Sequence, residues 1–401
     1  MKLLWVKSDF LHPTTKGGHI RTLEMLRRLS RRHEIHYVAF ADPNSPQGVL
    51  RSAEYCAHAY PIRRRIAPRT SPLFYLDLLR SLFSPLPIAV ARYRSRRMER
   101  TILDLRASQR FDAVVCDFLT PAPNISDLGA CILFQHNVET MIWRRHAEHA
   151  PDPLRRLLFS LQAGRMFRLE RAVCRKVARI VAVSPQDAAT MCELFGVANV
   201  AAIPTGVDID YFTPPETPPD SAADLVFVGS MDWLPNVDGV LYFVREVLPL
   251  IRRRRPDCSL AVVGRSPSPE VLALGRNDPR IHITGTVPDV RPYLWGSRVS
   301  IVPLRIGGGT RLKIYESMAA RVPVVSTTVG AEGLEIHPGT DIAIADTPEM
   351  FAARCVELLE NPAERFRLSE AAWQMVSSRF SWDQVTACFE QILMSARPEV
   401  V

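Results

Sequence analysis

The chain has 401 residues, of which 47% are hydrophobic and 23% charged, and its formal net charge is +8. This balance is that of ordinary globular proteins and excludes the disordered and fibrous classes. Because single hydrophobic cores seldom grow beyond roughly 250–300 residues, the length predicts two domains.

Positive charge is concentrated in the first half of the chain. Residues 1–207 hold 31 Lys and Arg against 17 Asp and Glu, whereas residues 208–401 hold 19 against 25. Such asymmetry suits contact with an anionic membrane face, a nucleic acid or a charged acceptor, although a basic surface without a partner gives the same composition. The eight cysteines are scattered and form no C-x-x-C pair, which predicts reduced thiols in the cytosol and no zinc site.

No targeting or membrane-spanning segment is evident in the sequence. The apolar run Leu3–Val6 ends at Lys7 and is too short for a signal-peptide core. No run approaches the roughly 18 apolar residues of a membrane span. We therefore expect a cytoplasmic protein, with peripheral contact at the inner face of the membrane as an open alternative.

Residues 1–207 alternate between short apolar runs and amphipathic segments, which predicts an α/β domain with a parallel sheet. A first βαβ unit is predicted from Leu3–Val6, a Gly17-Gly18 turn, a helix over 20–29 and Ile35–Phe40. Further strands are predicted at Ala113–Cys116, Cys131–Phe134, Arg179–Val183 and Val200–Ile203, and helices at Leu154–Val177 and Pro185–Phe195.

A proline-rich polar segment, 208–220, predicts a semi-rigid linker before a second α/β series at 221–380. We expect a final helix within 381–401, for which packing back on the first domain is one option. The strands predicted in the second series are Leu225–Val228, Ser259–Val263, Ile281–Thr284, Val299–Val302, Val322–Ser326 and Ile342–Ala345.

The predicted architecture is α/β, with two Rossmann-like domains whose parallel sheets face each other across a cleft. Open parallel sheets bind ligands at the carboxyl ends of their strands, so the chemistry is expected in that cleft.

A glycine-rich loop follows the predicted strand Val299–Val302 and leads directly into a helix. Its residues are Gly307, Gly308, Gly309, Thr310 and Arg311, followed by Leu312 and Lys313, with Glu316 one turn further along. Glycines permit a tight turn that gathers backbone N–H groups, and the start of the helix adds unsatisfied amides. With two cations beside it, this loop is predicted to bind a phosphate or diphosphate, although a glycine-rich surface turn with solvated cations has the same composition.

Three other predicted strand ends in the second half carry small or polar residues where a ligand would need close backbone approach. They are Gly229-Ser230 with Asn236, Gly264-Arg265, and Gly285-Thr286 leading through Val287 to Asp289. Any one of these glycines is more often a plain turn. Their recurrence at successive strand ends of one sheet favours a nucleotide site.

The chain resembles the family-four glycosyltransferases, which are retaining nucleotide-sugar enzymes of the GT-B fold. The resemblance rests on residues 203–208, 227–230, 262–265, 283–289 and 313–325, and it covers nearly the whole chain. It implies that Glu316, the second of two glutamates in the family's helix motif, binds the ribose hydroxyls. The first glutamate of that motif would fall at Gly308, so a carboxylate usually near the donor sugar is missing here.

In the first half, the resemblance implies that Gly17 and Gly18 form a loop whose amides approach the donor phosphate and the acceptor. It also implies that His136, in the run Phe134-Gln135-His136-Asn137, contacts the transferring sugar. A lone histidine is more often structural than catalytic, and that alternative stays open.

Asp208-Ile209-Asp210 has the spelling of a metal-binding D-x-D pair. Its position at the linker favours a structural turn, so we expect no catalytic metal and no cofactor beyond the nucleotide-diphosphate sugar substrate, with UDP and GDP both open. His136, Arg311 and Lys313 are the predicted catalytic residues. The cations would stabilise the departing diphosphate.

The predicted function is transfer of a hexose-type sugar from a nucleotide-diphosphate sugar to a hydroxyl of a glycan or lipid-linked acceptor. Retention of configuration is implied by the resemblance alone. A nucleotide-sugar epimerase and a catalytically silent sugar-nucleotide binding module are the alternatives, the latter because of Gly308. Nucleic-acid binding is disfavoured because no recognition motif accompanies the basic charge.

Overall fold

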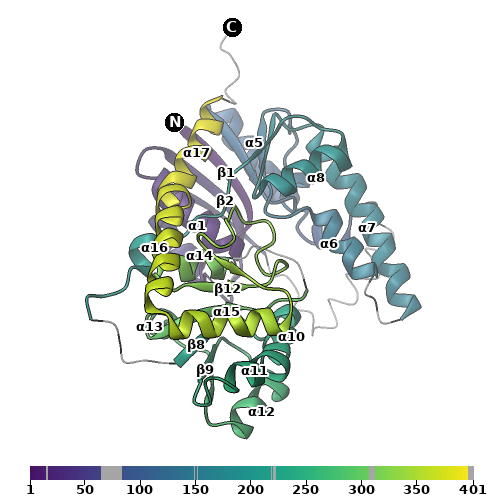
Figure 1. Cartoon of the computed structure of the whole chain (residues 1–401). Coiled ribbons are helices and arrows are strands. Elements are labelled where there is room, and N and C mark those ends of the chain that lie inside the picture. The colour runs from purple at the N-terminus through teal and green to yellow at the C-terminus, as the bar shows by residue number, and fades with distance from the viewer. Residues whose placement is uncertain are drawn as a thin grey trace. The chain divides into compact units, whose positions relative to one another are not determined.

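The computed structural model describes residues 1–14, 17–64, 84–148, 150, 152–217, 219, 223–306 and 312–395. The chain divides into two compact units (Figure 1). Unit 1 comprises Met1–Pro204 with Val385–Val401, and unit 2 comprises Thr205–Gln384.

Unit 1 is built on a seven-stranded sheet in the order β3-β2-β1-β4-β5-β6-β7. All pairings between these strands are parallel. The central strand β1 is buried along residues 3–8, as expected of a parallel strand covered on both faces. The strands are β1 (Lys2–Asp9), β2 (Glu34–Ala41), β3 (His58–Arg63), β4 (Ala113–Asp117), β5 (Cys131–Phe134), β6 (Arg179–Ala182) and β7 (Val200–Ala202).

Helices cover this sheet, and several of them begin at side-chain caps. Asp152 caps α7 and Ser184 caps α8, each by accepting a hydrogen bond from the backbone three residues on. The helices of unit 1 are α1 (Gly17–Leu29), α2 (Gln47–Leu50), α4 (Ile88–Ala91), α5 (Arg96–Ser108), α6 (Glu139–Glu148), α7 (Pro153–Cys174) and α8 (Pro185–Phe195).

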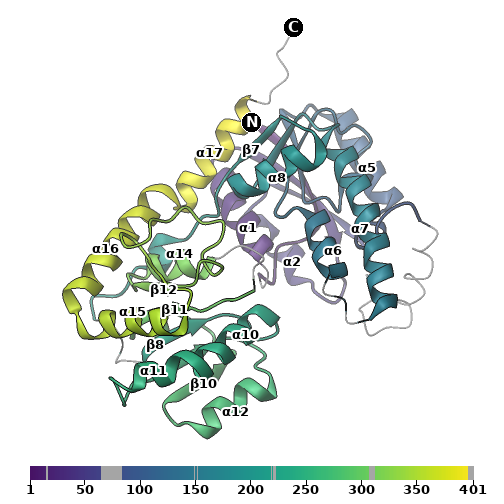
Figure 2. The same ribbon diagram turned by 45° about the vertical axis from the view of Figure 1, so that its right-hand side comes forward.

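The last helix, α17 (Trp382–Ser395), begins in unit 2 and belongs to unit 1 from Val385 onward (Figure 2). Phe389 packs between two aromatic side chains of the unit 1 sheet, with ring centroids 5.7 Å from Trp5 and 5.2 Å from Phe134. This apolar contact fixes the end of the described chain to unit 1.

Unit 2 is built on a six-stranded parallel sheet in the order β10-β9-β8-β11-β12-β13. Its strands are β8 (Ala223–Val228), β9 (Leu260–Val263), β10 (Ile281–Gly285), β11 (Ser297–Val302), β12 (Val324–Ser326) and β13 (Ala343–Ile344). Its helices are α9 (Ile209–Phe212), α10 (Leu234–Tyr242), α11 (Leu248–Arg252), α12 (Pro269–Asn277), α13 (Arg291–Trp295), α14 (Leu312–Ala319), α15 (Pro348–Glu360) and α16 (Pro362–Arg379).

Each sheet has one point at which the strand order reverses. In unit 1 the chain adds β2 and β3 on one side of β1 and then returns to place β4 on the other side. In unit 2 the same reversal separates β8 from β11. Open parallel sheets generally bind ligands at such a reversal, where the loops after the two flanking strands diverge.

The predicted linker segment is part of unit 2 as far as the structure describes it. Val207 forms a bridge with Ser381, and Asp208 caps α9 by accepting a hydrogen bond from the Tyr211 amide at 3.0 Å. The Asp208 carboxylate therefore makes a helix cap, in keeping with the structural turn expected for the D-x-D spelling.

The α/β prediction of two Rossmann-like domains with parallel sheets is confirmed. Strand β3 and helices α5 and α6 were not predicted. In β3 the alternation of polar and apolar residues is weak, since Ile62 is its one fully buried hydrophobic side chain. Within the described residues, no helix is both long and apolar enough to cross a membrane.

Candidate active site

In unit 2, the loops after the adjacent strands β8 and β9 touch through their backbones. A Cβ atom built on Gly264 would lie 1.8 Å from the carbonyl oxygen of Gly229, so only glycine fits at position 264. The Gly229 amide donates to the Val263 carbonyl at 2.9 Å, and the Met231 amide donates to the Arg265 carbonyl at 2.9 Å. The two predicted glycines thus hold two strand ends in contact.

Lys313 lies in the first turn of α14 and points to the end of β8. Its Nζ donates to Asn236 Oδ1 at 2.7 Å and lies 4.3 Å from the centroid of the Phe227 ring. Asn236 in turn donates from Nδ2 to the Ser230 carbonyl at 2.8 Å. A Cβ on Gly229 would come within 2.7 Å of Lys313 Nζ, so this glycine also leaves room for the ammonium group.

Arg265 lies on the solvent side of this group, which we call the Lys313 cluster (Phe227, Gly229, Ser230, Asn236, Gly264, Arg265 and Lys313). Its Nε donates to Ser230 Oγ at 2.8 Å, and its guanidinium lies 3.4 Å from Asp232. Two cations therefore stand at the carboxyl ends of β8 and β9, and β8 flanks the strand-order reversal where such sheets bind phosphate groups.

Glu316 is half-buried one turn after Lys313. Burial raises its pKa to about 7, with the positive charge of Lys313 acting in the opposite direction. Burial also raises the pKa of Tyr211, and the negative charges of Asp289 and Glu316 add to that effect. Glu316 is therefore a carboxyl group that titrates near neutral pH.

Asp289 and Val287 already make contacts within unit 2. Both Asp289 carboxylate oxygens accept hydrogen bonds from Arg291 Nε, at 3.0 and 2.9 Å, and the Arg291 guanidinium stacks 3.8 Å from the Tyr211 ring centroid. Val287 packs against the core of unit 2. A donor contact by Asp289 would have to share its carboxylate with Arg291.

Five predicted residues lie outside the described residues. They are Gly307, Gly308, Gly309, Thr310 and Arg311, the glycine-rich loop before α14. Their predicted role in binding the diphosphate stays a prediction.

In unit 1, a buried carboxylate gathers four donors at the strand-order reversal. Asp117, the last residue of β4, is fully buried. Its Oδ1 lies 2.9 Å from Lys7 Nζ and 2.8 Å from His136 Nε2. Its Oδ2 accepts from Trp5 Nε1 at 2.9 Å and from Thr22 Oγ1 at 2.8 Å. These contacts hold the pKa of Asp117 well below its ordinary value, against the opposing effect of burial.

His136 is neutral in this arrangement and has a defined tautomer. Burial lowers its pKa to about 3, although Asp117 acts in the opposite direction. A carboxylate only accepts, so Nε2 carries the proton shared with Asp117 and Nδ1 remains an acceptor. The imidazole therefore offers a hydrogen-bond acceptor rather than a proton.

Gly18 lies directly over this imidazole. A Cβ on Gly18 would come 2.7 Å from the Phe118 ring and 3.7 Å from His136 Nδ1. Phe118 stacks on His136 with ring centroids 4.0 Å apart, and its own φ of +70° is unusual for a non-glycine residue. Gly17 and Gly18 are the first residues of α1 rather than a turn before it, so the predicted turn is wrong, and Gly18 lies beside Phe118 and His136. The roles predicted for Gly17, Gly18 and His136 stay predictions.

Two family models match the chain in succession. One, described as "Glycosyltransferase Family 4", matches residues 15–211, and another, "Glycosyl transferases group 1", matches residues 222–361. Together they account for most of both units. The chain is a group 1 glycosyltransferase.

Among curated relatives, this glycosyltransferase is 20% identical over 404 residues to an "Uncharacterized 44.6 kDa protein in cps region" of Klebsiella pneumoniae, covering 96% of this chain and 97% of that protein. It is 27% identical to "D-inositol 3-phosphate glycosyltransferase 2" of Catenulispora acidiphila, over 52% of this chain and 54% of that protein. The second match thus spans about half of the relative's length.

Solved structures with the same fold cover almost the whole glycosyltransferase. Sucrose-phosphate synthase of Thermosynechococcus elongatus has a TM-score of 0.70 at 16% identity, covering 98% of each chain. Anabaena HepE in complex with UDP has a TM-score of 0.69 at 12% identity, covering 98% of this chain and all of the other. At these identities the likeness shows the fold, which is the predicted GT-B fold.

Sequence reasoning missed several polar residues that the glycosyltransferase buries in unit 1. Lys7 and Asp117 lie at the ends of apolar runs. A charged residue at such a position is the signal that could have identified them. Arg21 is 3% exposed, and neither terminal nitrogen of its guanidinium has a hydrogen-bond partner among the described residues. Its position four residues after Gly17, in the helix that begins at this glycine, could have drawn attention to it.

A buried glutamate also fixes the segment that follows His136. Glu170 of α7 accepts hydrogen bonds from the backbone amides of Glu139 and Thr140 at 3.0 and 2.8 Å, and from Gln135 Nε2 at 2.9 Å. Glu170 therefore caps the start of α6 from another helix, and no local sequence pattern predicts this contact. Burial and the Glu170 charge raise the pKa of Glu139 to about 7.

We expect Asp117→Asn to lower the free energy of unfolding by about 3–5 kcal/mol, since it removes one member of a buried ion pair and leaves the Lys7 ammonium without a counter-charge. Urea denaturation followed by circular dichroism measures this. Asp127→Asn is the control, because the pair between exposed Asp127 and Arg106 should contribute at most about 1 kcal/mol. Equal denaturation midpoints for the two variants would contradict the role given to Asp117.

Proposed function

We propose that this glycosyltransferase moves a sugar from a nucleotide-diphosphate sugar to a hydroxyl group of a glycan or lipid-linked acceptor, in polysaccharide or glycoconjugate biosynthesis. The observation that carries the proposal is the Lys313 cluster, which places two cations at the carboxyl ends of β8 and β9, with Glu316 one turn after Lys313 on α14 and a pKa of about 7. The fold neighbour HepE was solved with UDP, which supports a nucleotide-linked donor.

Lys313 and Arg265 are proposed to bind the diphosphate, together with Arg311 and the amides of the preceding loop. In this proposal they stabilise the charge that develops on the leaving diphosphate, where preorganised donors have most effect on the barrier. No metal ion and no further cofactor enters the proposed reaction. The nucleotide base, UDP or GDP, is left to experiment.

Glu316 is proposed to accept hydrogen bonds from the ribose hydroxyls. In its ionised form it is an acceptor only, and two adjacent hydroxyls are matched donors for its two oxygens. The cost of desolvating a charged carboxylate is then offset by the bound hydroxyls.

Unit 1 is proposed to act on the sugar and the acceptor through His136 and through Gly17 and Gly18 at the start of α1. The neutral imidazole offers Nδ1 as an acceptor for a sugar hydroxyl. Asp117 already has four hydrogen-bonding partners and is fully buried, so it is a poor candidate for a nucleophile. We therefore propose retention by attack on the same face, with the diphosphate as base, and assignment to the retaining family four.

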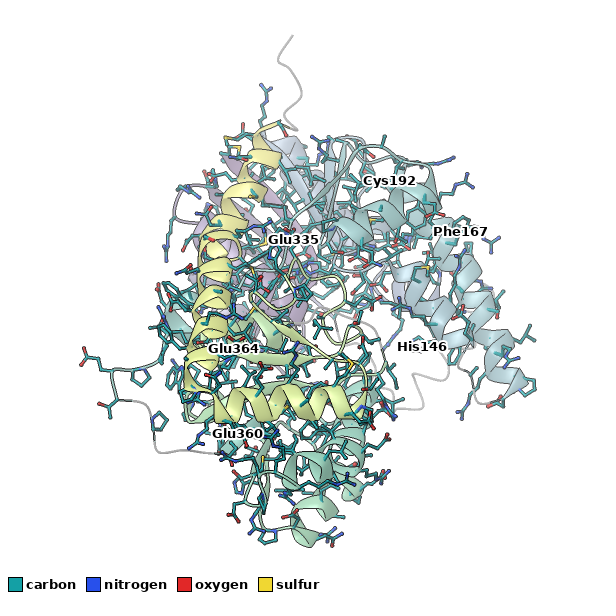
Figure 3. All side chains as sticks on the ribbon, in the orientation of Figure 1. His146, Phe167, Cys192, Glu335, Glu360 and Glu364 are labelled. Atoms are coloured by element: carbon teal, nitrogen blue, oxygen red, sulfur yellow. The ribbon has the colours of Figure 1, made fainter. Side chains whose placement is uncertain are left out.

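An acceptor linked to lipid would make membrane contact useful, and we propose weak peripheral contact through the basic face of unit 1. Arg144 of α6 lies 5.8 Å from the centroid of the Phe167 ring on α7. Figure 3 labels Phe167 together with His146 of α6. Leu154, Leu157 and Leu161 are exposed on α7. These residues combine arginines with apolar side chains, as interfacial helices do. The sequence also carries basic and aromatic residues over 73–106, of which 73–83 lie outside the described residues.

The homology to glycosyltransferases does not favour an epimerase or a silent binding module. Labelled UDP-glucose and GDP-mannose separate the three possibilities. Slow hydrolysis or transfer of the sugar supports the transferase, inversion at position 2 the epimerase, and binding without turnover the module.

We expect Lys313→Ala and Glu316→Ala each to lower donor affinity or turnover at least about tenfold, which is roughly 1.4 kcal/mol. Lys176→Ala is the matched control, because Lys176 is an exposed lysine of unit 1 outside the site. Isothermal titration and single-turnover assays with UDP-glucose and GDP-mannose measure both quantities. Wild-type constants in Lys313→Ala and Glu316→Ala would remove the proposed donor site.

Donor affinity should rise with pH through about 7 and then level off, because the Glu316 carboxylate binds ribose better than the protonated acid does. Below pH 7 the loss approaches tenfold per pH unit at most. Nucleotide sugars are suitable probes, since their diphosphate diesters do not titrate near neutrality. The profile of Glu316→Gln should be flat; if it keeps the slope of the wild-type profile, another group titrates.

A further inference from the structure

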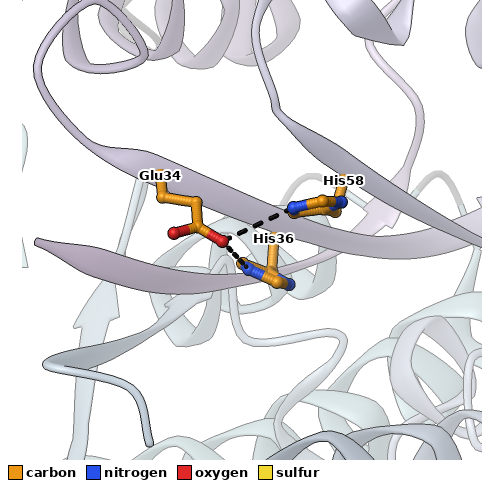
Figure 4. A group of neighbouring side chains, drawn as sticks. All are labelled: Glu34, His36 and His58. Carbon is orange, nitrogen blue, oxygen red and sulfur yellow. Dashed lines mark hydrogen bonds and ion pairs between the residues drawn. The ribbon is translucent and has the colours of Figure 1, made fainter. Parts of the chain in front are cut away.

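Three side chains that bind metal ions in other proteins meet on one face of the unit 1 sheet. In the register of β2 and β3, His36 stands directly opposite His58. Glu34 precedes His36 by two residues, so strand alternation puts both on the same face. Figure 4 shows the three side chains converging from the two strands.

The separations between the three ligand atoms suit a single small cation. Glu34 Oε1 lies 2.9 Å from His36 Nε2 and 3.4 Å from His58 Nε2. All three ligand atoms lie within 4.8 Å of one another. In tetrahedral zinc sites, bond lengths of about 2.0–2.1 Å put neighbouring ligand atoms about 3.3 Å apart. The two separations from Glu34 Oε1, 2.9 and 3.4 Å, lie on either side of that value.

The buried member of the set is held in place by further contacts. His36 is 2% exposed, and its Nδ1 lies 2.9 Å from the Tyr60 hydroxyl. That hydroxyl can accept the Nδ1 proton when Nε2 binds a metal ion, which is the usual support of a metal-binding histidine. Gln109 Nε2 also lies 3.3 Å from Nδ1 and would have to turn away when Nδ1 is protonated. The Tyr60 ring also stacks on His36, with centroids 5.8 Å apart.

One charge opposes a cation at this position. Lys2 Nζ lies 3.4 Å from Glu34 Oε1 and donates to Gln109 Oε1 at 3.1 Å. The ammonium therefore occupies part of the space around the carboxylate that a metal ion would use. Removing the Lys2 charge should therefore strengthen metal binding. If the ion pair between Lys2 and Glu34 were purely structural, its removal would not have this effect.

We propose that Glu34, His36 and His58 bind a divalent late transition-metal ion, for which Zn²⁺ is the best match. Two imidazoles and one carboxylate are a common zinc ligand set, and three protein ligands leave the fourth position to water or an external ligand. The cysteine spacing, which argues against a zinc site, has no bearing on these ligands.

The site lies at the opposite end of the unit 1 sheet from the Asp117 and His136 network. His58 is the first residue of β3 and Glu34 the first of β2, whereas Asp117 is the last residue of β4. In a parallel sheet, the first residues of the strands and the last residues of the strands lie at opposite ends of the sheet. A metal ion here would join the edge strand β3 to its neighbour β2 and would stabilise that edge of unit 1.

Calorimetric titration of the chelator-treated full chain with ZnCl₂ tests the proposal. We expect one tight site, a higher unfolding temperature with Zn²⁺, and at least tenfold weaker binding in His58→Ala and in Glu34→Gln. Both positions are exposed, so these variants should fold; circular dichroism checks this. Lys2→Ala should bind Zn²⁺ more tightly than the wild type.

The control is His282→Ala, which removes an exposed histidine of β10 in unit 2 and should bind Zn²⁺ as the wild type does. Cu²⁺ bound to the wild type should show two nitrogen ligands in its electron paramagnetic resonance spectrum, and His58→Ala should lose one. No Zn²⁺ binding, wild-type affinity in His58→Ala, or sulfur ligation reported by a Co²⁺ charge-transfer band would each overturn the proposal.

Discussion

The fully buried carboxylate of Asp117 is the interaction on which the organisation of unit 1 depends. It joins β1 through Trp5 and Lys7, α1 through Thr22, and the end of β5 through His136. An ionised group in the interior is tolerated only when its hydrogen-bonding capacity is filled, and here two oxygens face four donors. The same network sets the tautomer of His136, so the charge that organises the fold also decides what the imidazole can offer a ligand.

In unit 2, a backbone contact rather than a buried charge holds the strand ends of the candidate site together. The contact between Gly229 and Gly264 excludes any side chain at position 264 and brings the ends of β8 and β9 together. Lys313 then fills the space above Gly229 with an ammonium group that Asn236 and the Phe227 ring hold in place. A cation positioned in this way needs little rearrangement when an anion binds, which is the physical basis of electrostatic preorganisation.

The sequence predicted the features of this arrangement that depend on residues close together in the chain. Apolar runs such as Leu3–Val6 and the strand-end glycines Gly229 and Gly264 place strands and their turns, because burial and backbone freedom act on neighbouring residues. The sequence could not predict which side chains far apart in the chain contact one another. The partners of Asp117 come from positions 5, 7, 22 and 136, and Glu170 caps α6 from another helix. Those pairings depend on sheet order, which a single sequence does not encode in any local pattern.

The two units also differ in how they treat their key carboxyl groups. Four donors hold the pKa of Asp117 far below the ordinary range, so its charge does not change near neutral pH and serves the fold. Burial leaves Glu316 with a pKa of about 7, and among the described residues the Lys313 charge opposes this rise. A buried carboxyl group gains most from hydrogen-bond donors when its surroundings have not already supplied them. The contrast agrees with a structural role for Asp117, and it is the reason for proposing Glu316 as the carboxyl group that responds to a bound hydroxylated ligand.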